Sequence, residues 1–120
     1  MVLATCNKAK QLFLLSYFGQ VSRSDLERSR EDYNGLLAEM RLGFRLLVDL
    51  TGLESMKLDC MDLIGEFMRL MDQSGVGMVV RVIPDPKKDI GLSILSVFHY
   101  PSRIQIITCE ARKEALELLD

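Results

Sequence analysis

The sequence predicts a single α/β domain, residues 1–120, built on a mostly parallel β-sheet with helices packed on it. Two apolar runs rich in strand formers open the chain, and segments of helical periodicity then alternate with further strand-like runs. The resulting order, ββαβαβαβα, implies parallel crossovers with helices on the sheet faces. The composition agrees, because 48% hydrophobic and 27% charged residues are typical of a globular domain with one core.

The first two strands are expected to form a hairpin. Residues 2–6 and 11–18 are apolar, and the short polar connection 7–10 joins them, which is the pattern of two antiparallel strands. Gly19 is expected to end the second strand.

A helix is expected next, with Ser22 or Ser24 as its N-cap. Glu27 follows Ser24 by three residues, the spacing at which its carboxylate reaches back to the cap amide. One apolar stripe recurs at helical spacing and consists of Leu26, Tyr33, Leu37 and Met40. Gly43 is expected to end this helix.

The middle of the chain predicts a strand, a helix and a second strand. Residues 44–50 hold the apolar run Leu46-Leu47-Val48, bounded by charge and glycine, which is typical of a strand covered on both faces. Residues 59–73 carry helical periodicity and are followed by Gly75; their apolar positions are Ile64, Phe67, Met68 and Met71. Residues 78–83 predict the next strand, which ends at Pro84 because proline cannot donate to a ladder.

The last third predicts a short helix, a strand and a final helix. Asp89 is placed to cap a helix that runs to residue 98, and Pro101 follows it. Residues 103–108 predict the last strand. Residues 110–119 predict the last helix, with Glu110 in the first turn, where its charge suits the helix dipole.

The loops at the carboxyl ends of the strands are where function is expected in a sheet of this kind. In this chain they begin after Asp49, Ile83 and Thr108. The second of these loops, residues 84–91, has two prolines and a run of charges. Its residues Asp85, Lys87, Lys88 and Asp89 form a candidate contact surface for another protein.

Four segments carry a resemblance to a known family. They are Asp49-Leu50-Thr51-Gly52-Leu53, then Lys57-Leu58-Asp59-Cys60, then Gly75-Val76-Gly77-Met78-Val79-Val80, and finally Glu114-Ala115-Leu116. With this element order, the chain resembles the STAS domain family, which includes anti-sigma factor antagonists. In that family the first segment reads Asp-Leu-Ser-Gly-Val, and the second reads Asp-Ser-Ser-Gly at the start of a helix.

The resemblance implies a regulatory protein-binding domain that has lost its phosphorylation switch. In the ungapped register the family's phosphorylated serine falls on Asp59, and the nearest hydroxyl is Ser55, four residues upstream. A register shifted by two places Cys60 and Met61 there, which also supply no hydroxyl.

Two interpretations of Asp59 follow from its place at a helix start. Its carboxylate can cap the helix by accepting backbone N–H bonds. Alternatively, its charge partly replaces that of a phosphoserine. The expected partner-binding residues are Asp49, Thr51, Asp59, Cys60 and Asp62. For Asp49, bonds to the turn amides at Thr51 and Gly52 are the simpler role.

Charge and cysteine content exclude several classes of function. Fifteen basic and 17 acidic residues leave a net charge of −2, which argues against nucleic-acid binding. Three separated cysteines, at positions 6, 60 and 109, suggest neither a disulfide framework nor a metal site. The cysteine usage predicts a reduced, cytoplasmic protein, and no apolar run is long enough for a membrane span. Because the sequence shows no catalytic constellation, we also expect a non-enzymatic protein with no cofactor.

Two other functions remain open, besides a regulatory module that binds another protein. A phosphotransfer receiver has a similar element order and would use Asp49 as its phosphoacceptor, but Gly19 and Gln20 stand where receivers carry an acidic pair. A carrier of small apolar, lipid-like ligands is compatible with the apolar share of the chain. A homodimer is compatible with the exposed edges of such a sheet.

Overall fold

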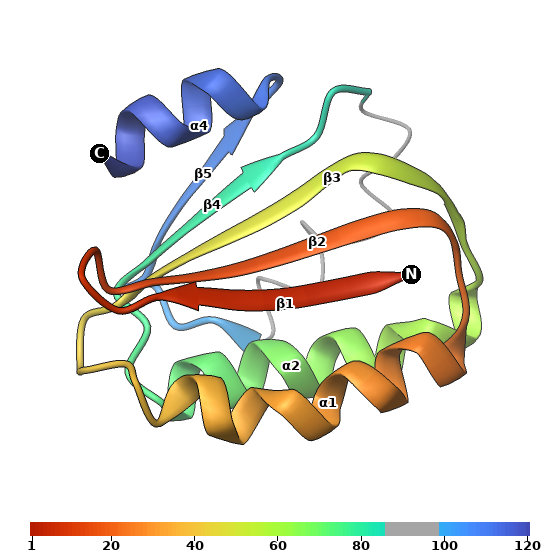
Figure 1. Cartoon of the computed structure of the whole chain (residues 1–120), viewed down its shortest axis with the longest axis horizontal. Coiled ribbons are helices and arrows are strands. Elements are labelled where there is room, and N and C mark those ends of the chain that lie inside the picture. Colours follow the sequence, from red (N-terminus) through yellow and green to blue (C-terminus); the bar gives the residue numbers. More distant parts are fainter. Residues whose placement is uncertain (86–98) are drawn as a thin grey trace.

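A computed structural model describes residues 1–85 and 99–120, and its five-stranded sheet has the predicted α/β architecture (Figure 1). The strand order follows the sequence, β1-β2-β3-β4-β5. β1 and β2 pair antiparallel, and every other neighbouring pair is parallel. The strands are β1 Val2–Asn7, β2 Leu12–Val21, β3 Arg45–Met56, β4 Met78–Val82 and β5 Gln105–Cys109.

Helices cover both faces of the sheet. Helices α1 (Arg23–Leu37) and α2 (Met61–Gln73) lie side by side on one face, and α4 (Arg112–Leu119) lies on the other (Figure 1). A single turn of 3-10 helix, η1 (Leu58–Cys60), leads into α2. The predicted helix 89–98 lies outside the described residues, as do Lys87, Lys88 and Asp89. No helix in the described part of the chain is long and apolar enough to cross a membrane.

The larger core lies between the sheet and the pair α1 and α2. The predicted stripes of both helices contribute to it, and the rings of Phe13, Tyr33 and Phe67 pack together at its centre, with centroids 5.2–6.2 Å apart. A smaller core on the other face is closed by Ala115 and Leu119 of α4. Two cores on one sheet explain why consecutive residues are apolar and buried in the middle of β3, at Leu46–Val48, and in β4, at Val79 and Val80.

Strand β3 is longer than predicted. The sequence indicated a strand over residues 44–50 and a turn over 49–53, but β3 continues to Met56. Its pairing with β2 shifts register between Ser16 and Phe18 and again after Gly19, so the turn-like segment is absorbed as a bulge in the strand. The same pairing carries β2 past Gly19 to Val21. Gly19 lies at the second register shift and has a positive φ of 65°, a conformation that glycine adopts without strain.

The ends of the helices also differ from the sequence prediction. The capping box of α1 joins Ser22 to Asp25, not Ser24 to Glu27, and Glu27 instead pairs with Arg23. Helix α1 ends at Leu37, well before Gly43. The last helix begins at Arg112, two residues after the predicted start at Glu110. Sequence periodicity located these helices, but their ends depend on which side chains reach the terminal amides.

Candidate functional site

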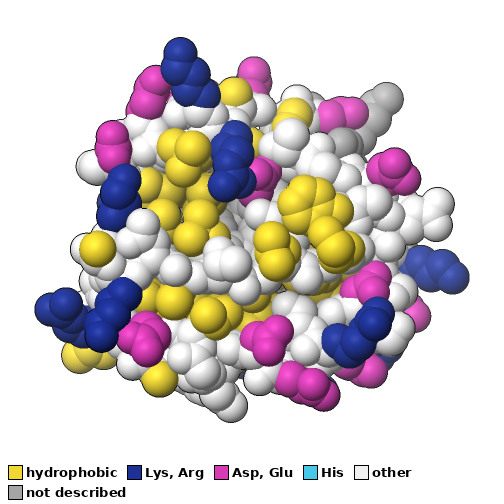
Figure 2. Space-filling model, viewed as in Figure 1, with side chains coloured by type: hydrophobic (Ala, Val, Ile, Leu, Met, Phe, Trp, Pro, Cys, Tyr) yellow, Lys and Arg dark blue, Asp and Glu magenta, His cyan; other side chains and the backbone are white. Residues whose placement is uncertain are grey.

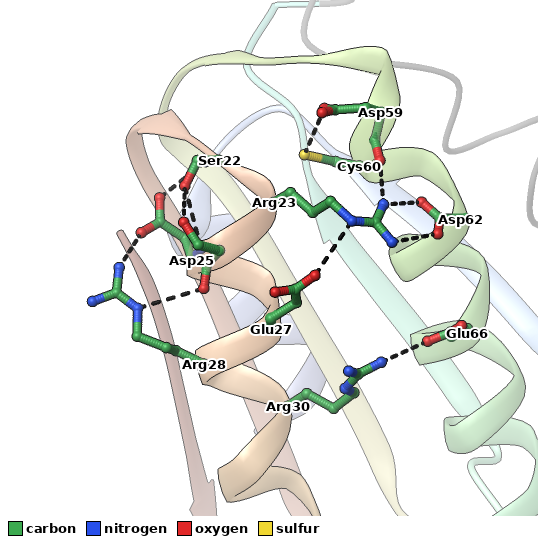
Figure 3. Close-up of polar contacts among 11 residues, drawn as sticks. Ser22, Arg23, Asp25, Glu27, Arg28, Arg30, Asp59, Cys60, Asp62 and Glu66 are labelled. Carbon is green, nitrogen blue, oxygen red and sulfur yellow. Dashed lines mark hydrogen bonds and ion pairs between the residues drawn. The ribbon is translucent and has the colours of Figure 1, made fainter.

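The candidate site is an exposed corner where α1 and α2 begin, which we call the corner surface. It consists of Arg23 at the start of α1, Leu58, Asp59 and Cys60 in η1, and Asp62 in the first turn of α2. Figure 3 shows the polar groups of this corner facing one another between the two helix starts. Three of its five residues, Asp59, Cys60 and Asp62, were predicted from the sequence.

Arg23 joins the two helix starts. Its Nη1 and Nη2 donate to the two carboxylate oxygens of Asp62, at 2.6 and 2.8 Å, and Nη1 also donates to the backbone carbonyl of Asp59 at 2.6 Å (Figure 3). Glu27 lies 3.3 Å from Nε on the opposite side. The planar guanidinium therefore holds η1 and α2 in one position relative to α1.

These contacts shift the pKa values of Arg23 and Asp62. The hydrogen bond from Arg23 lowers the pKa of the Asp62 carboxyl, and the same bond raises the pKa of Arg23. Both side chains are exposed to solvent, so water and salt screen the pair and it adds little to global stability. The main effect of the pair is to hold η1 and the start of α2 in position relative to α1.

Asp59 does not cap a helix. It lies in η1, and neither η1 nor α2 has a side-chain cap bond. Its carboxylate is exposed and accepts only a long contact from Cys60 Sγ, at 3.7 Å, within the described residues. The capping interpretation is therefore wrong. Because of the turn of 3-10 helix, Cys60 occupies the N-cap position of α2, and Asp59 is the residue before it.

Cys60 is a buried thiol at the start of α2. Burial raises its pKa, and the neighbouring charge of Asp59 raises it further. A reactive cysteine at a helix start would show the opposite shift. Cys60 thus behaves as a small core residue.

Sequence analysis missed Leu58 and Arg23. Leu58 is 83% exposed, although leucine is normally buried, and its only signal was an apolar residue in an otherwise polar segment, 57–59. Arg23 lies 39 residues from Asp62 in the chain, so no local pattern could have joined them.

Asp49 and Thr51 belong to a different place in the molecule. Asp49 Oδ1 accepts from the backbone N–H of Thr51 at 2.9 Å and from its hydroxyl at 2.5 Å, as the turn interpretation predicted for Thr51. Asp49 Oδ2 accepts from Arg112 Nη1 at 2.5 Å, at the start of α4. The structure therefore divides the predicted site, because Asp49 faces α4 whereas the corner lies beside α1 and α2.

The environment of Asp49 suits a structural carboxylate. Burial raises its pKa, but the bonds from Thr51 and Arg112 outweigh burial, and the net pKa lies below the usual value. Both carboxylate oxygens are occupied, which does not favour a role as phosphoacceptor. Asp85, the one described member of the second predicted contact loop, is exposed just after β4.

In the described part of the chain, two small pockets lie beside Tyr17, next to α1 and α2. They measure about 40 and 10 Å³, far below the roughly 300–1,000 Å³ of a typical ligand pocket, so neither of these two holds an apolar, lipid-like ligand. Among residues 1–85 and 99–120 there is also no cluster of three or more His, Cys, Asp or Glu side chains arranged to hold a metal.

Comparison with solved structures shows the fold family of this chain. No protein-family model matches the sequence, and no curated protein matches it. An uncharacterized protein of the DUF3478 family with a SpoIIAA-like fold, from Shewanella loihica PV-4, matches with a TM-score of 0.72 and 14% identity over 100% of this chain and 93% of that one.

Two anti-sigma factor antagonists are also similar. SpoIIAA in its unphosphorylated form matches with a TM-score of 0.63 and 14% identity, over 99% of this chain and 97% of that one. An anti-sigma factor antagonist from Mycobacterium paratuberculosis matches with a TM-score of 0.58 and 15% identity, over 99% and 92%. The chain therefore has the SpoIIAA-like fold, which is the STAS-like fold that the sequence predicted.

Proposed function

We propose that this protein is a non-catalytic regulatory module that binds a partner protein through the corner surface. The observation that carries the proposal is the exposure of Leu58 beside a rigid, charged frame. A leucine that is 83% exposed is held by η1 next to Asp59 and Asp62, and Arg23 fixes that turn in place. Apolar anchors within a polar surround are typical of protein contact sites.

The chemistry of the corner indicates what kind of partner fits it. Asp59 is exposed and is not in a salt bridge within the described residues. A second carboxylate, Glu27 on α1, lies 3.3 Å from Arg23 (Figure 3). A complementary partner would have a small apolar pocket for Leu58 rimmed by basic side chains. The two similar anti-sigma factor antagonists support a regulatory role for this fold, although fold alone does not assign function.

We further propose that the corner has a single binding state, without a phosphorylation switch. Asp59 stands where the resembled family has its phosphorylated serine. Its fixed negative charge lies beside the carbonyl that Arg23 holds, so part of a phosphate's charge is present permanently.

The absence of catalysis is supported by the state of the carboxylates. General acid catalysis needs a carboxyl whose pKa is raised towards neutrality. Asp62 has the opposite shift because of Arg23, and Glu66, one turn further along α2, is exposed and paired with Arg30 at 2.9 Å.

The experiment compares two exposed leucines. Leu58→Asp and Leu42→Asp replace side chains that are 83% and 88% exposed, but only Leu58 lies on the corner surface. Proteins captured from a native lysate by the wild-type chain should be retained by Leu42→Asp and lost by Leu58→Asp, with unchanged thermal melting of both. In the same assay, Asp59→Ser should change capture more than melting. Equal capture by all variants would refute the proposal.

A further inference from the structure

We propose that strand β1 is a dimerisation edge, through which two copies of this chain join their sheets into one continuous antiparallel sheet about a two-fold axis at Leu3. This inference is independent of the proposed function, because it uses none of the corner residues. It rests on the hydrogen-bonding pattern of β1, on its side chains, and on the charges of the neighbouring helix.

The outer edge of β1 has unused hydrogen-bonding groups. Met1 and Phe18 exchange both backbone bonds, at 2.8 Å each, and bonded pairs alternate along an antiparallel ladder. The backbone groups of Leu3, Thr5 and Asn7 therefore face β2, whereas those of Val2, Ala4 and Cys6 point away from the sheet. Within residues 1–85 and 99–120, nothing bonds to them.

In the described part of the chain, the edge also lacks the features by which proteins block such pairing. Edge strands are usually protected by charged side chains, proline or a covering segment, but β1 reads Val-Leu-Ala-Thr-Cys-Asn. Figure 2 shows hydrophobic side chains gathered over β1 and β2, with most charged side chains around them. A surface hollow of about 360 Å³ lies between the start of β1 and α1, and it is lined by Met1, Val2, Asp25, Arg28, Ser29 and Asp32.

The side chains of β1 match a second copy of the same strand. Val2, Ala4 and Cys6 face α1 and are half-buried, whereas Leu3, Thr5 and Asn7 are exposed on the other face. A two-fold axis perpendicular to the sheet at Leu3 keeps each set on its own face. It makes Val2 and Ala4 of opposite copies a bonded pair, and it places the two Leu3 side chains, each 51% exposed, directly opposite each other.

Charges on α1 fit the same axis. The Met1 amine lies 3.6 Å from Asp25, so α1 and β1 start at the same level, and both run in the same direction (Figure 1). At about 1.5 Å per helix residue and about 3.3 Å per strand residue, Arg28 lies nearly level with Val2 and Asp32 with Ala4. A two-fold axis at Leu3 exchanges these levels, so Arg28 of each copy meets Asp32 of the other.

Asp32 is available for that contact. It is exposed and has no ion pair in the described part of the chain. Arg28 bonds Asp25 at 2.8 Å and has further N–H groups to donate. By symmetry, the dimer forms two ion pairs between Arg28 of one copy and Asp32 of the other. These pairs favour a second copy of this chain, and not an unrelated strand, as the partner of β1.

The first test is sedimentation velocity on the full chain, from about 1 to about 500 µM. We expect a monomer–dimer equilibrium. Ala4→Pro removes an outward N–H without touching the bonds to β2, so by symmetry it deletes two intersubunit bonds and should raise the dimer dissociation constant about tenfold or more. A wild-type chain that stays monomeric throughout this range overturns the proposal.

The second test remains informative if Ala4→Pro disturbs folding. Leu3→Lys and Leu3→Glu each place like charges opposite each other at the axis, on an exposed side chain, so each variant alone should be monomeric. An equimolar mixture of the two should recover the dimer. Thr108→Lys, at an exposed position of the other edge strand β5, is the matched control and should dimerise normally. Dimers that persist in Leu3→Lys, or that are lost only in Thr108→Lys, overturn the proposal.

Discussion

Two arginines each begin a helix in this protein and each binds an aspartate from another element. Arg112 is the first residue of α4 and binds the buried Asp49, whereas Arg23 is the first residue of α1 and binds the exposed Asp62. A cation at a helix N-terminus is opposed by the helix dipole, so both arginines need an anion nearby. The two pairs have the same chemistry and differ in burial.

That difference separates a structural contact from a contact surface. Asp49 is enclosed by β3, Thr51 and Arg112, so its charge depends on those bonds for solvation. Asp62 is solvated by water whether or not Arg23 is present. We therefore expect the Asp49 pair to contribute to the free energy of unfolding, and the Arg23 pair to control local geometry and partner binding.

The largest effect is expected from Asp49→Ala. Removing the carboxylate leaves Arg112 and the Thr51 hydroxyl without their acceptor, and breaking a buried pair commonly costs about 3–5 kcal/mol. Because the Arg112 side chain is 46% exposed and can turn to water, we expect a loss of about 2 kcal/mol in the free energy of unfolding.

Urea denaturation measures this loss, with Asp120→Ala as the control. That variant removes an exposed pair with Lys10 and should leave the midpoint nearly unchanged. Equal destabilisation by the two variants would show that burial does not distinguish the pairs.

The second-largest effect is expected in the pH dependence of the free energy that the Asp49–Arg112 pair contributes to stability. The folded-state pKa of Asp49 lies below its unfolded value, so the unfolded state takes up the proton first and stability falls as the pH drops below about 4. The difference in unfolding free energy between wild type and Asp49→Ala should be constant above about pH 5 and shrink in more acidic solution. A difference that stays constant to pH 2 would contradict this assignment.

A smaller, local effect is expected from Arg23→Ala. The unfolding midpoint should barely change, but amide hydrogen exchange over η1 and the first turn of α2 should accelerate, because Arg23 no longer holds the Asp59 carbonyl. Arg30→Ala breaks the exposed pair with Glu66, further along the same helices, and should leave exchange in η1 unchanged. Faster exchange across the whole sheet in Arg23→Ala would instead indicate a global contribution.

The smallest effect concerns the thiol of Cys60. With a chromogenic disulfide reagent and mass-spectrometric assignment, the half-buried Cys6 should react before the buried Cys60 and Cys109. Asp59→Ala removes the charge that adds to the effect of burial on the pKa of Cys60, so that thiol should react about twofold faster. If Cys60 reacts first in the wild type, the corner is more open than the structure indicates.

Much of the fold could be read from periodicity, because the apolar spacing of a helix or strand is a local property of the sequence. The hairpin, helix α2 and strand β4 were predicted close to their observed bounds, and the apolar stripe located α1 but not its C-terminal end. The errors fall where a longer-range contact decides. Strand β3 continues through a turn-like segment because β2 lies beside it, and the cap of α1 uses Asp25 because that carboxylate reaches the Ser22 amide.

The candidate site was only partly predictable. Sequence patterns identified Asp49, Thr51, Asp59, Cys60 and Asp62 as polar groups near element ends, but grouped them as one surface. The sheet separates them, since Asp49 faces α4 whereas Asp59 and Asp62 lie beside α1. Arg23 was missed because its partners are 36 and 39 residues away.

The sequence by itself determined the α/β class, the order of the described elements and their apolar faces, because each depends only on which residues occur and at what spacing. Tertiary structure alone decided which charges are buried, which arginine meets which aspartate, and that Leu58 and the edge of β1 remain exposed. Burial and pairing depend on neighbours distant in the chain, and those neighbours are set only when the sheet and its helices assemble.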